Sequence, residues 1–207
     1  AAALQRDGVA ARQAVAIVGT TSLDYAVVFL GAIRAGCAPA PIAPPSTGEQ
    51  MAAMIADCAA PLLFLDAEAA ATIGDRPVAA KRVVLDGSGA GVALAEWLGD
   101  ATAPDPVTIG PDDPFNIIYS SGTTGTPKGI VQPHAMRWAH IARNEAAGFG
   151  DAVTMVATPL YSNTTLVSFI PTLAWGGTAV LLGKFDARGF LEAAAKHRAT
   201  HAMLEVG

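Results

Sequence analysis

One segment of the sequence, Tyr119–Gly129, carries the residue types of a phosphate-binding loop. It reads Tyr-Ser-Ser-Gly-Thr-Thr-Gly-Thr-Pro-Lys-Gly and combines three glycines, five serine or threonine hydroxyls and one lysine. Glycine lets the backbone turn with its N–H groups exposed, hydroxyls donate hydrogen bonds to phosphate oxygens, and lysine adds a positive charge. The segment therefore has the groups needed to hold a polyphosphate.

The spacing of these residues differs from that of the Walker A loop. A Walker A loop places Gly-Lys-Ser/Thr five residues after its first glycine, whereas Lys128 here lies between Pro127 and Gly129. From the residues alone, a Ser/Thr/Gly-rich surface loop without a ligand stays open as the alternative.

Short apolar runs of strand length alternate with helix-like stretches along the chain. The predicted strands lie near 15–18, 38–42, 61–66, 82–86, 115–119, 153–157, 178–182 and from 201 onward. The predicted helices lie near 23–35, 46–59, 136–147, 166–175 and after Asp186. Gly36 suits the end of the first helix, and Ser46 with Glu49 predicts a capping box for the second. This alternation indicates βαβ crossovers, so the predicted fold class is α/β, with mostly parallel β-sheets covered by helices on both faces.

The stretch from Gly99 to Pro114 is rich in proline, aspartate, glycine and threonine, which predicts a linker. It divides the chain into a first α/β subdomain at 1–110, expected to be incomplete at its N-terminus, and a second α/β segment at 111–207. The second segment carries the phosphate-binding loop and is expected to be incomplete at its C-terminus. Prolines and a glycine pair interrupt the uncharged stretch between Asp151 and Lys184, which favours a buried strand–helix–strand over a membrane span.

The composition narrows the class of partner. A net charge of −5 gives no long-range attraction to nucleic acid, so any bound phosphate must be held by local groups. The sequence opens without a secretory signal. Cys37 and Cys58 lack metal-ligand spacing and are expected to be core residues of a protein in a reducing compartment, which favours the cytoplasm. The oligomeric state cannot be read from the sequence.

At Ser120–Gly129 the sequence resembles the adenylate-forming (AMP-binding) superfamily of acyl-CoA synthetases, luciferases and peptide-synthetase adenylation domains. The signature of that superfamily is Ser/Thr-Ser/Thr/Gly-Gly-Thr-Thr-Gly-x-Pro-Lys-Gly, and this chain matches it throughout. The similarity extends to Leu30–Pro44, to Thr158–Tyr161 and to Trp175–Val180, so it covers the chain from about Val15 to Met203. The resemblance implies part of the large N-terminal domain of such an enzyme, with the C-terminal domain absent.

The resemblance also implies an activity, that of an acid–thiol ligase of acyl-CoA synthetase type. Such enzymes join a carboxylate to the α-phosphate of ATP, release pyrophosphate, and pass the acyl group from AMP to coenzyme A. The residues implied to hold the β- and γ-phosphates are Ser120, Ser121, Gly122, Thr123, Thr124, Gly125 and Thr126. The Thr123 hydroxyl is expected near Mg²⁺, and Lys128 is expected either to neutralise phosphate charge or to pair with a nearby carboxylate.

The same resemblance places the acyl-substrate wall at Tyr161, Ser162 and Asn163. Many acyl-CoA synthetases have histidine where this chain has Ser162. The apolar run Leu166–Trp175 favours a fatty or other apolar acid. An amino-acid-activating domain is the nearest alternative, but it needs an acidic residue for the substrate ammonium, and none occurs between Pro159 and Ala174.

A non-catalytic nucleotide-binding module is the alternative from a different class. The family's ribose-binding aspartate and the lysine of its C-terminal domain are not found in these 207 residues, so the chain by itself is expected to be inactive.

The four histidines do not indicate a metal site or a catalytic site. His197 and His201 have i, i+4 spacing without an acidic or cysteine partner, His134 is expected to pack or hydrogen-bond, and His140 is expected to lie partly exposed on a helix.

Overall fold

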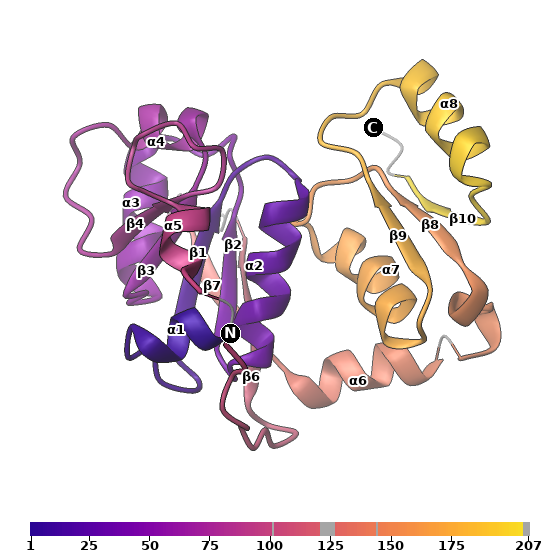
Figure 1. Ribbon diagram of the computed structural model, residues 1–207, viewed down its shortest axis with the longest axis horizontal. Helices are drawn as coiled ribbons and strands as arrows, with labels where there is room; N and C mark the ends of the chain where they lie inside the picture. The colour runs from indigo at the N-terminus through magenta and orange to yellow at the C-terminus, as the bar shows by residue number, and fades with distance from the viewer. Residues whose placement is uncertain (101, 121–126, 144, 205–207) are drawn as a thin grey trace. The chain divides into compact units, whose positions relative to one another are not determined.

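The structure, a computed structural model, describes residues 1–100, 102–120, 127–143 and 145–204. Its contacts divide the chain into two compact units. The first consists of Ala1–Gly19 with Asp24–His134, and the second of Thr20–Leu23 with the chain from Ala135 onward (Figure 1). The first unit includes the strands on both sides of the predicted phosphate-binding loop, so this division falls later in the sequence than the predicted segments 1–110 and 111–207.

The first unit contains a five-stranded sheet with the order β2-β1-β3-β4-β5. All neighbouring strands in it run parallel. Their bounds are β1 (Ala14–Val18), β2 (Ala38–Ile42), β3 (Leu62–Leu65), β4 (Lys81–Val84) and β5 (Val92–Ala93). The predicted α/β class with mostly parallel strands is confirmed.

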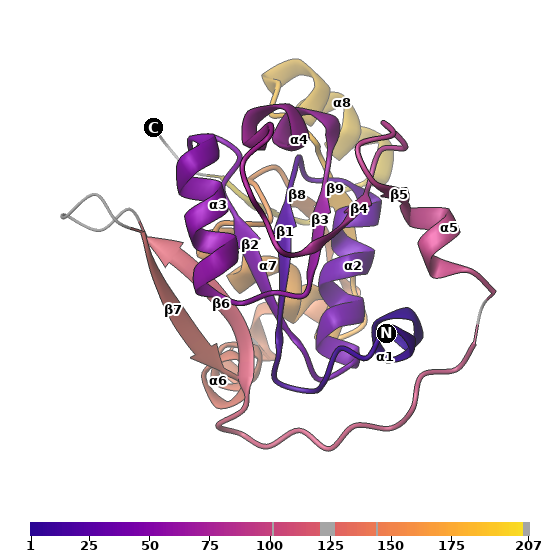
Figure 2. The same cartoon turned by 90° about the vertical axis from the view of Figure 1, so that its left-hand side faces the viewer.

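Helices cover this sheet on both faces. They are α1 (Ala2–Arg6), α2 (Leu23–Arg34), α3 (Gly48–Asp57), α4 (Ala67–Ile73) and α5 (Leu94–Leu98). Figures 1 and 2 show α3 and α4 over one face and α2 over the other. The helix α2 ends where the sequence predicts, because Gly36 adopts φ 74° and lets the chain turn back into β2.

A core of apolar side chains fills the space between the sheet and the helices α3 and α4. Because side chains alternate along a strand, every second residue of the central strands faces this core. Its members are Ala14, Ala16, Val18, Ile42, Met51, Met54, Ile55, Ala60, Leu63, Leu65, Ala69, Ile73 and Ala80. Burial of this set holds α3 against the sheet.

The N-terminus of α3 differs from the prediction by one residue. The backbone N–H of Gln50 donates to Thr47 Oγ1 at 3.2 Å, and Thr47 N–H donates to Gln50 Oε1 at 2.9 Å. The predicted capping box of Ser46 and Glu49 is therefore wrong. Ser46 instead belongs to the preceding turn, where its N–H donates to Ala43 O at 3.0 Å.

The loop-flanking segments form an antiparallel hairpin, and its second strand is missing from the prediction. Strand β6 (Pro114–Ser120) pairs with β7 (Lys128–Pro133), and β6 also lies against β2. The partly buried side chains of Ile117 and Tyr119 pack against the α3 core. The sequence gives little sign of β7, because only Ile130 and Val131 are β-branched between the glycine and proline breakers, and both are exposed.

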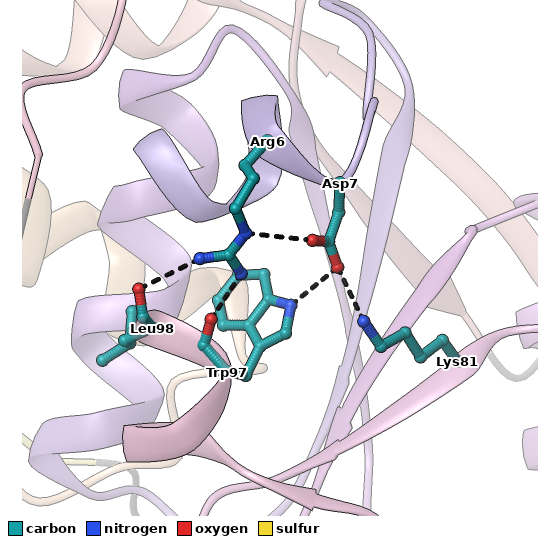
Figure 3. A network of polar contacts seen from close by, with 5 residues as sticks. All are labelled: Arg6, Asp7, Lys81, Trp97 and Leu98. Carbon is teal, nitrogen blue, oxygen red and sulfur yellow. Dashed lines mark hydrogen bonds and ion pairs between the residues drawn. The ribbon is translucent and has the colours of Figure 1, made fainter. Parts of the chain in front are cut away.

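A polar network joins the N-terminal helix α1 to α5 and β4 (Figure 3). The Asp7 carboxylate accepts hydrogen bonds from Lys81 Nζ at 2.9 Å and from Trp97 Nε1 at 2.9 Å. The guanidinium of Arg6 donates to Asp7 and to the carbonyl oxygens of Trp97 and Leu98, and it lies 5.9 Å from the centre of the Trp97 ring. These contacts join α1 to residues that lie 74 to 92 positions away in the sequence.

The second unit contains a three-stranded parallel sheet with the order β10-β8-β9. Its elements are α6 (His134–Arg143), the 3₁₀ turns η1 (Glu145–Ala147) and η2 (Phe149–Asp151), β8 (Val153–Val156), α7 (Asn163–Ala174), β9 (Thr178–Leu181), α8 (Ala187–His197) and β10 (His201–Met203). Helix α7 packs on all three strands. In the described part of the chain, no helix combines the length and the apolar character that crossing a membrane requires.

Candidate functional site

The two ends of the predicted phosphate-binding loop meet at the open end of the β6–β7 hairpin. Ser120 is the last residue of β6, Lys128 is the first of β7, and the two are partners in the strand register. Both side chains are exposed. The hairpin therefore presents one hydroxyl and one ammonium group side by side, where the chain leaves and re-enters the sheet.

Six of the predicted phosphate-binding residues lie outside the described residues. They are Ser121, Gly122, Thr123, Thr124, Gly125 and Thr126. Their phosphate contacts, and the contact of Thr123 with Mg²⁺, stay predictions. Lys128 makes no ion pair with any described residue, so both of its predicted roles also stay predictions.

A tyrosine–aspartate contact lies immediately beside the loop and is absent from the sequence-based prediction. The Tyr119 hydroxyl donates to Asp57 Oδ2 at 2.8 Å and lies 3.0 Å from Met54 O, so it reaches the last turn of α3. Burial and the hydrogen bond to the Asp57 carboxylate both raise the pKa of Tyr119. The phenol is therefore a stable neutral donor. A local sequence pattern cannot reveal this contact, because 62 positions separate the two residues.

The other end of the hairpin is held by a second polar contact. Arg12 donates to both carboxylate oxygens of Asp113, from Nε at 2.6 Å and from Nη2 at 3.0 Å. The Asp113 carbonyl oxygen accepts from His134 N–H at 3.0 Å. The His134 ring packs edge-on against Phe115, with ring centres 5.1 Å apart. Burial lowers the pKa of His134, and the nearby Asp113 carboxylate opposes this. Of the predicted packing or hydrogen-bonding role of His134, the packing is confirmed by the ring contact with Phe115, and the hydrogen bond is made by the backbone N–H.

The predicted substrate-wall residues lie in the second unit, around the N-terminus of α7. Ser162 is the N-cap residue, Asn163 is the first helical residue, and both are half-buried, as is Tyr161. The turn before them is fixed by a buried hydroxyl, because Thr165 Oγ1 lies 2.7 Å from Pro159 O and 2.6 Å from Thr158 Oγ1. Their contact with a substrate stays a prediction.

A buried arginine contacts this wall and is also absent from the prediction. The side chain of Arg137 on α6 is only 1% exposed, and its Nη2 donates to Asn163 Oδ1 at 3.1 Å. Burial lowers the pKa of Arg137 to about 10, so the guanidinium is still charged at neutral pH. Burial and the neighbouring charges of Arg137 and Arg143 lower the pKa of His140. Helical spacing alone could not distinguish buried Arg137 from exposed Arg143.

The histidine pair with i, i+4 spacing is divided between two elements. His197 ends α8, whereas His201 begins β10. His201 Nε2 lies 2.8 Å from Ala147 O, and its ring stacks on Phe149 with centres 5.1 Å apart. Within the described residues, no group of three or more histidine, cysteine or acidic side chains could hold a metal ion.

Comparison with known proteins relates this chain to one family of enzymes. The sequence profile of the family described as AMP-binding enzyme matches residues 1–204. Indoleacetate–CoA ligase of Aromatoleum aromaticum is 31% identical over 218 residues, which cover 99% of this chain and 42% of that protein. Long-chain-fatty-acid–CoA ligase FadD13 of Mycobacterium tuberculosis is 29% identical, with 87% of this chain and 37% of that protein covered.

A relative of another kind, surfactin synthase subunit 3 of Bacillus subtilis, is 29% identical over 77% of this chain and 12% of that protein. The chain thus spans less than half the length of these curated relatives.

Solved structures show the same fold. The N-terminal domain of FACL13 from Mycobacterium tuberculosis matches with a TM-score of 0.84 and 21% identity, over 97% of this chain and 52% of that one. The amide bond synthetase McbA from Marinactinospora thermotolerans matches with a TM-score of 0.79 and 27% identity, over 97% of this chain and 41% of that one. The predicted similarity to the N-terminal domain of adenylate-forming enzymes is confirmed.

Proposed function

Because the chain belongs to the AMP-binding enzyme family, we propose that it supplies the ATP-phosphate-binding part of a carboxylic acid–CoA ligase. The pairing of Ser120 with Lys128 at the open end of the hairpin carries this proposal. It brings the first and last polar residues of the signature together at the open end of the hairpin.

The loop residues would act on ATP, while the substrate carboxylate itself is the nucleophile. The carboxylate oxygen attacks the α-phosphorus, the bond from that phosphorus to the bridging oxygen breaks, and pyrophosphate leaves with the electron pair. Hydroxyls and backbone N–H groups from Ser120 to Thr126, with the ammonium of Lys128, would stabilise the charge on the departing pyrophosphate. A serine or cysteine nucleophile is not needed.

The proposed Mg²⁺ would be held mainly by the nucleotide, with Thr123 as its protein ligand. No cluster of metal-binding side chains occurs among the residues that the structure describes. Mg²⁺ commonly binds through phosphate oxygens with only one or two protein ligands, so a single hydroxyl from Thr123 fits this chemistry. When bound, the ion would offset negative charge on the β- and γ-phosphates.

We infer a fatty or other apolar acid as the substrate, with coenzyme A as the acceptor. The relatives named for indoleacetate and for long-chain fatty acids support this class. Helix α7 also supports it, because Leu166, Phe169 and Ile170 are buried beside the proposed wall at Tyr161–Asn163.

Amino-acid activation is the second candidate, and the similarity to the surfactin synthase subunit favours it. It is the weaker of the two, because the wall segment from Pro159 to Ala174 contains no acidic side chain that could bind an ammonium group.

Pyrophosphate release by the complete protein encoded by the gene tests the proposal. We expect release with ATP, Mg²⁺ and apolar acids, and thioester formation when coenzyme A is added. The 207-residue chain alone should bind nucleotide weakly and form no thioester. Release with amino acids only would favour the second candidate. No release with any acid would indicate a non-catalytic nucleotide-binding module and contradict the proposal.

A further inference from the structure

The hairpin that presents Ser120 and Lys128 needs an external support. A two-stranded hairpin is marginally stable by itself, and its open end is where pairing is weakest. The side chains of Ile130 and Val131 in β7 add little burial to stabilise the hairpin, because they are 51% and 57% exposed. Contacts that fasten this end to the rest of the first unit therefore decide where the two polar side chains lie.

Tyr119 makes such a contact one residue before the loop. It is the penultimate residue of β6, next to Ser120, and its hydroxyl reaches the Asp57 carboxylate and the Met54 carbonyl oxygen in the last turn of α3. Helix α3 is itself fixed by Met51, Met54 and Ile55, which are at most 3% exposed in the core. The bond thus connects the open end of the hairpin to a helix that the core holds in place.

Gly129 makes room for this contact on the opposite strand. It is the register partner of Tyr119 and directly follows Lys128. A Cβ atom at this position would lie 3.2 Å from Tyr119 Cε1 and 3.3 Å from Asp57 Oδ2, which is tighter than ordinary packing. The bare backbone of Gly129 therefore lets the tyrosine ring cross β7 and reach α3.

We propose that Asp57 and Tyr119 are positioning residues, which fasten the open end of the β6–β7 hairpin to α3 across Gly129 and so hold Ser120 and Lys128 in place for phosphate binding. The proposal rests on the proposed function, because it assumes that these two side chains contact ATP. It assigns a role to Asp57 and Tyr119, which lie outside the signature Ser120–Gly129 and are 62 positions apart in the sequence.

Hydrogen–deuterium exchange in the complete protein tests the anchor itself. Tyr119→Phe keeps the ring and removes the hydroxyl, and Asp57→Ala removes the acceptor. Each should speed exchange of the amides within residues 117–131 by roughly three- to tenfold, the effect of losing one partly exposed hydrogen bond to a charged group. Asp57→Asn keeps an acceptor oxygen and should restore most of the protection. The double variant should match the single variants, because one interaction is lost in each.

Steady-state kinetics test the consequence for ATP. Tyr119→Phe and Asp57→Ala should raise the KM for ATP roughly three- to tenfold, with a smaller change in kcat at saturating ATP, because the lost contact acts on binding geometry. The KM for the acid should stay unchanged.

Asp7→Ala is the matched control. The Asp7 carboxylate also accepts a hydrogen bond from an aromatic residue of the first unit, Trp97, but at the α1–α5 network of Figure 3. This variant should lower the unfolding temperature without changing exchange at residues 117–131 or the KM for ATP.

Wild-type exchange at 117–131 in Tyr119→Phe would refute the anchor. Faster exchange with an unchanged KM for ATP would refute its positioning role. If the wild-type protein releases no pyrophosphate with any acid, the proposed function fails instead, and exchange still decides whether the anchor exists.

Discussion

Gly129 and Tyr119 face each other across the β6–β7 hairpin, one on each side of the predicted phosphate-binding loop. Gly129→Ala would place a methyl group 3.2 Å from both Tyr119 Cε1 and Ile117 Cγ2. We expect this crowding to lower the free energy of unfolding by about 1–2 kcal/mol.

Urea denaturation would measure this loss. Gly110→Ala is a suitable control, because a Cβ atom there makes only ordinary contact, 3.7 Å from Asp113 Oδ2. An equal loss in both variants would contradict the crowding argument.

Thr47 and Ser46 allow a direct test of the α3 N-cap. Thr47→Ala removes the acceptor of the Gln50 N–H, so it should cost about 1 kcal/mol of stability, as loss of an N-cap usually does. Ser46→Ala should change the midpoint of denaturation very little, because the Ser46 contact to Ala43 uses only the backbone. A larger loss of stability in Ser46→Ala than in Thr47→Ala would support the capping box of Ser46 and Glu49 that the sequence predicts.

Arg137 should contribute strongly to the stability of the second unit. Arg137→Ala removes a side chain that is 1% exposed, leaves a cavity and deprives Asn163 Oδ1 of a donor. We expect a loss of about 2–4 kcal/mol in the free energy of unfolding. Arg143→Ala, on the same helix but exposed, should stay within about 0.5 kcal/mol of wild type in the same measurement.

The Asp7 network should make stability depend on pH in the acid range. Partial burial opposes ionisation of Asp7, but the hydrogen bonds from Lys81, Trp97 and Arg6 outweigh it and lower the pKa of the carboxyl group. A carboxyl group with a lowered pKa in the folded state contributes stability above its unfolded pKa of about 4 and loses it as the pH falls through the folded value.

The difference in unfolding free energy between wild type and Asp7→Asn should therefore have its largest value at neutral pH and become smaller below a pH of about 4. Lys81→Met should weaken this dependence, because the hydrogen bond from Lys81 lowers the pKa of Asp7 more than those from Trp97 and Arg6 do. If this difference in unfolding free energy grew on acidification, it would contradict a lowered pKa for Asp7.

Lys128 should affect nucleotide binding more than stability. Its side chain is exposed at the start of β7, so Lys128→Met should leave the unfolding temperature nearly unchanged. Loss of a positive charge next to bound phosphate should weaken ATP binding by about tenfold, measurable by calorimetric titration of the complete protein. Lys184→Met, another exposed lysine, should bind ATP as wild type does.

The sequence by itself determined the alternation of strands and helices, the end of α2 at Gly36 and the identity of the signature from Ser120 to Gly129. These features depend on side-chain periodicity and on the turn chemistry of neighbouring residues, which a local pattern records.

Only the tertiary structure decided the pairing of β7 with β6, the contact of Tyr119 with Asp57 and the burial of Arg137. Strand β7 contains few apolar residues and forms because β6 offers it a hydrogen-bonding edge. Arg137 is buried because other elements of the fold cover it. Both depend on which distant segments meet when apolar surface is removed from water, and the order of residues along one segment does not contain that information.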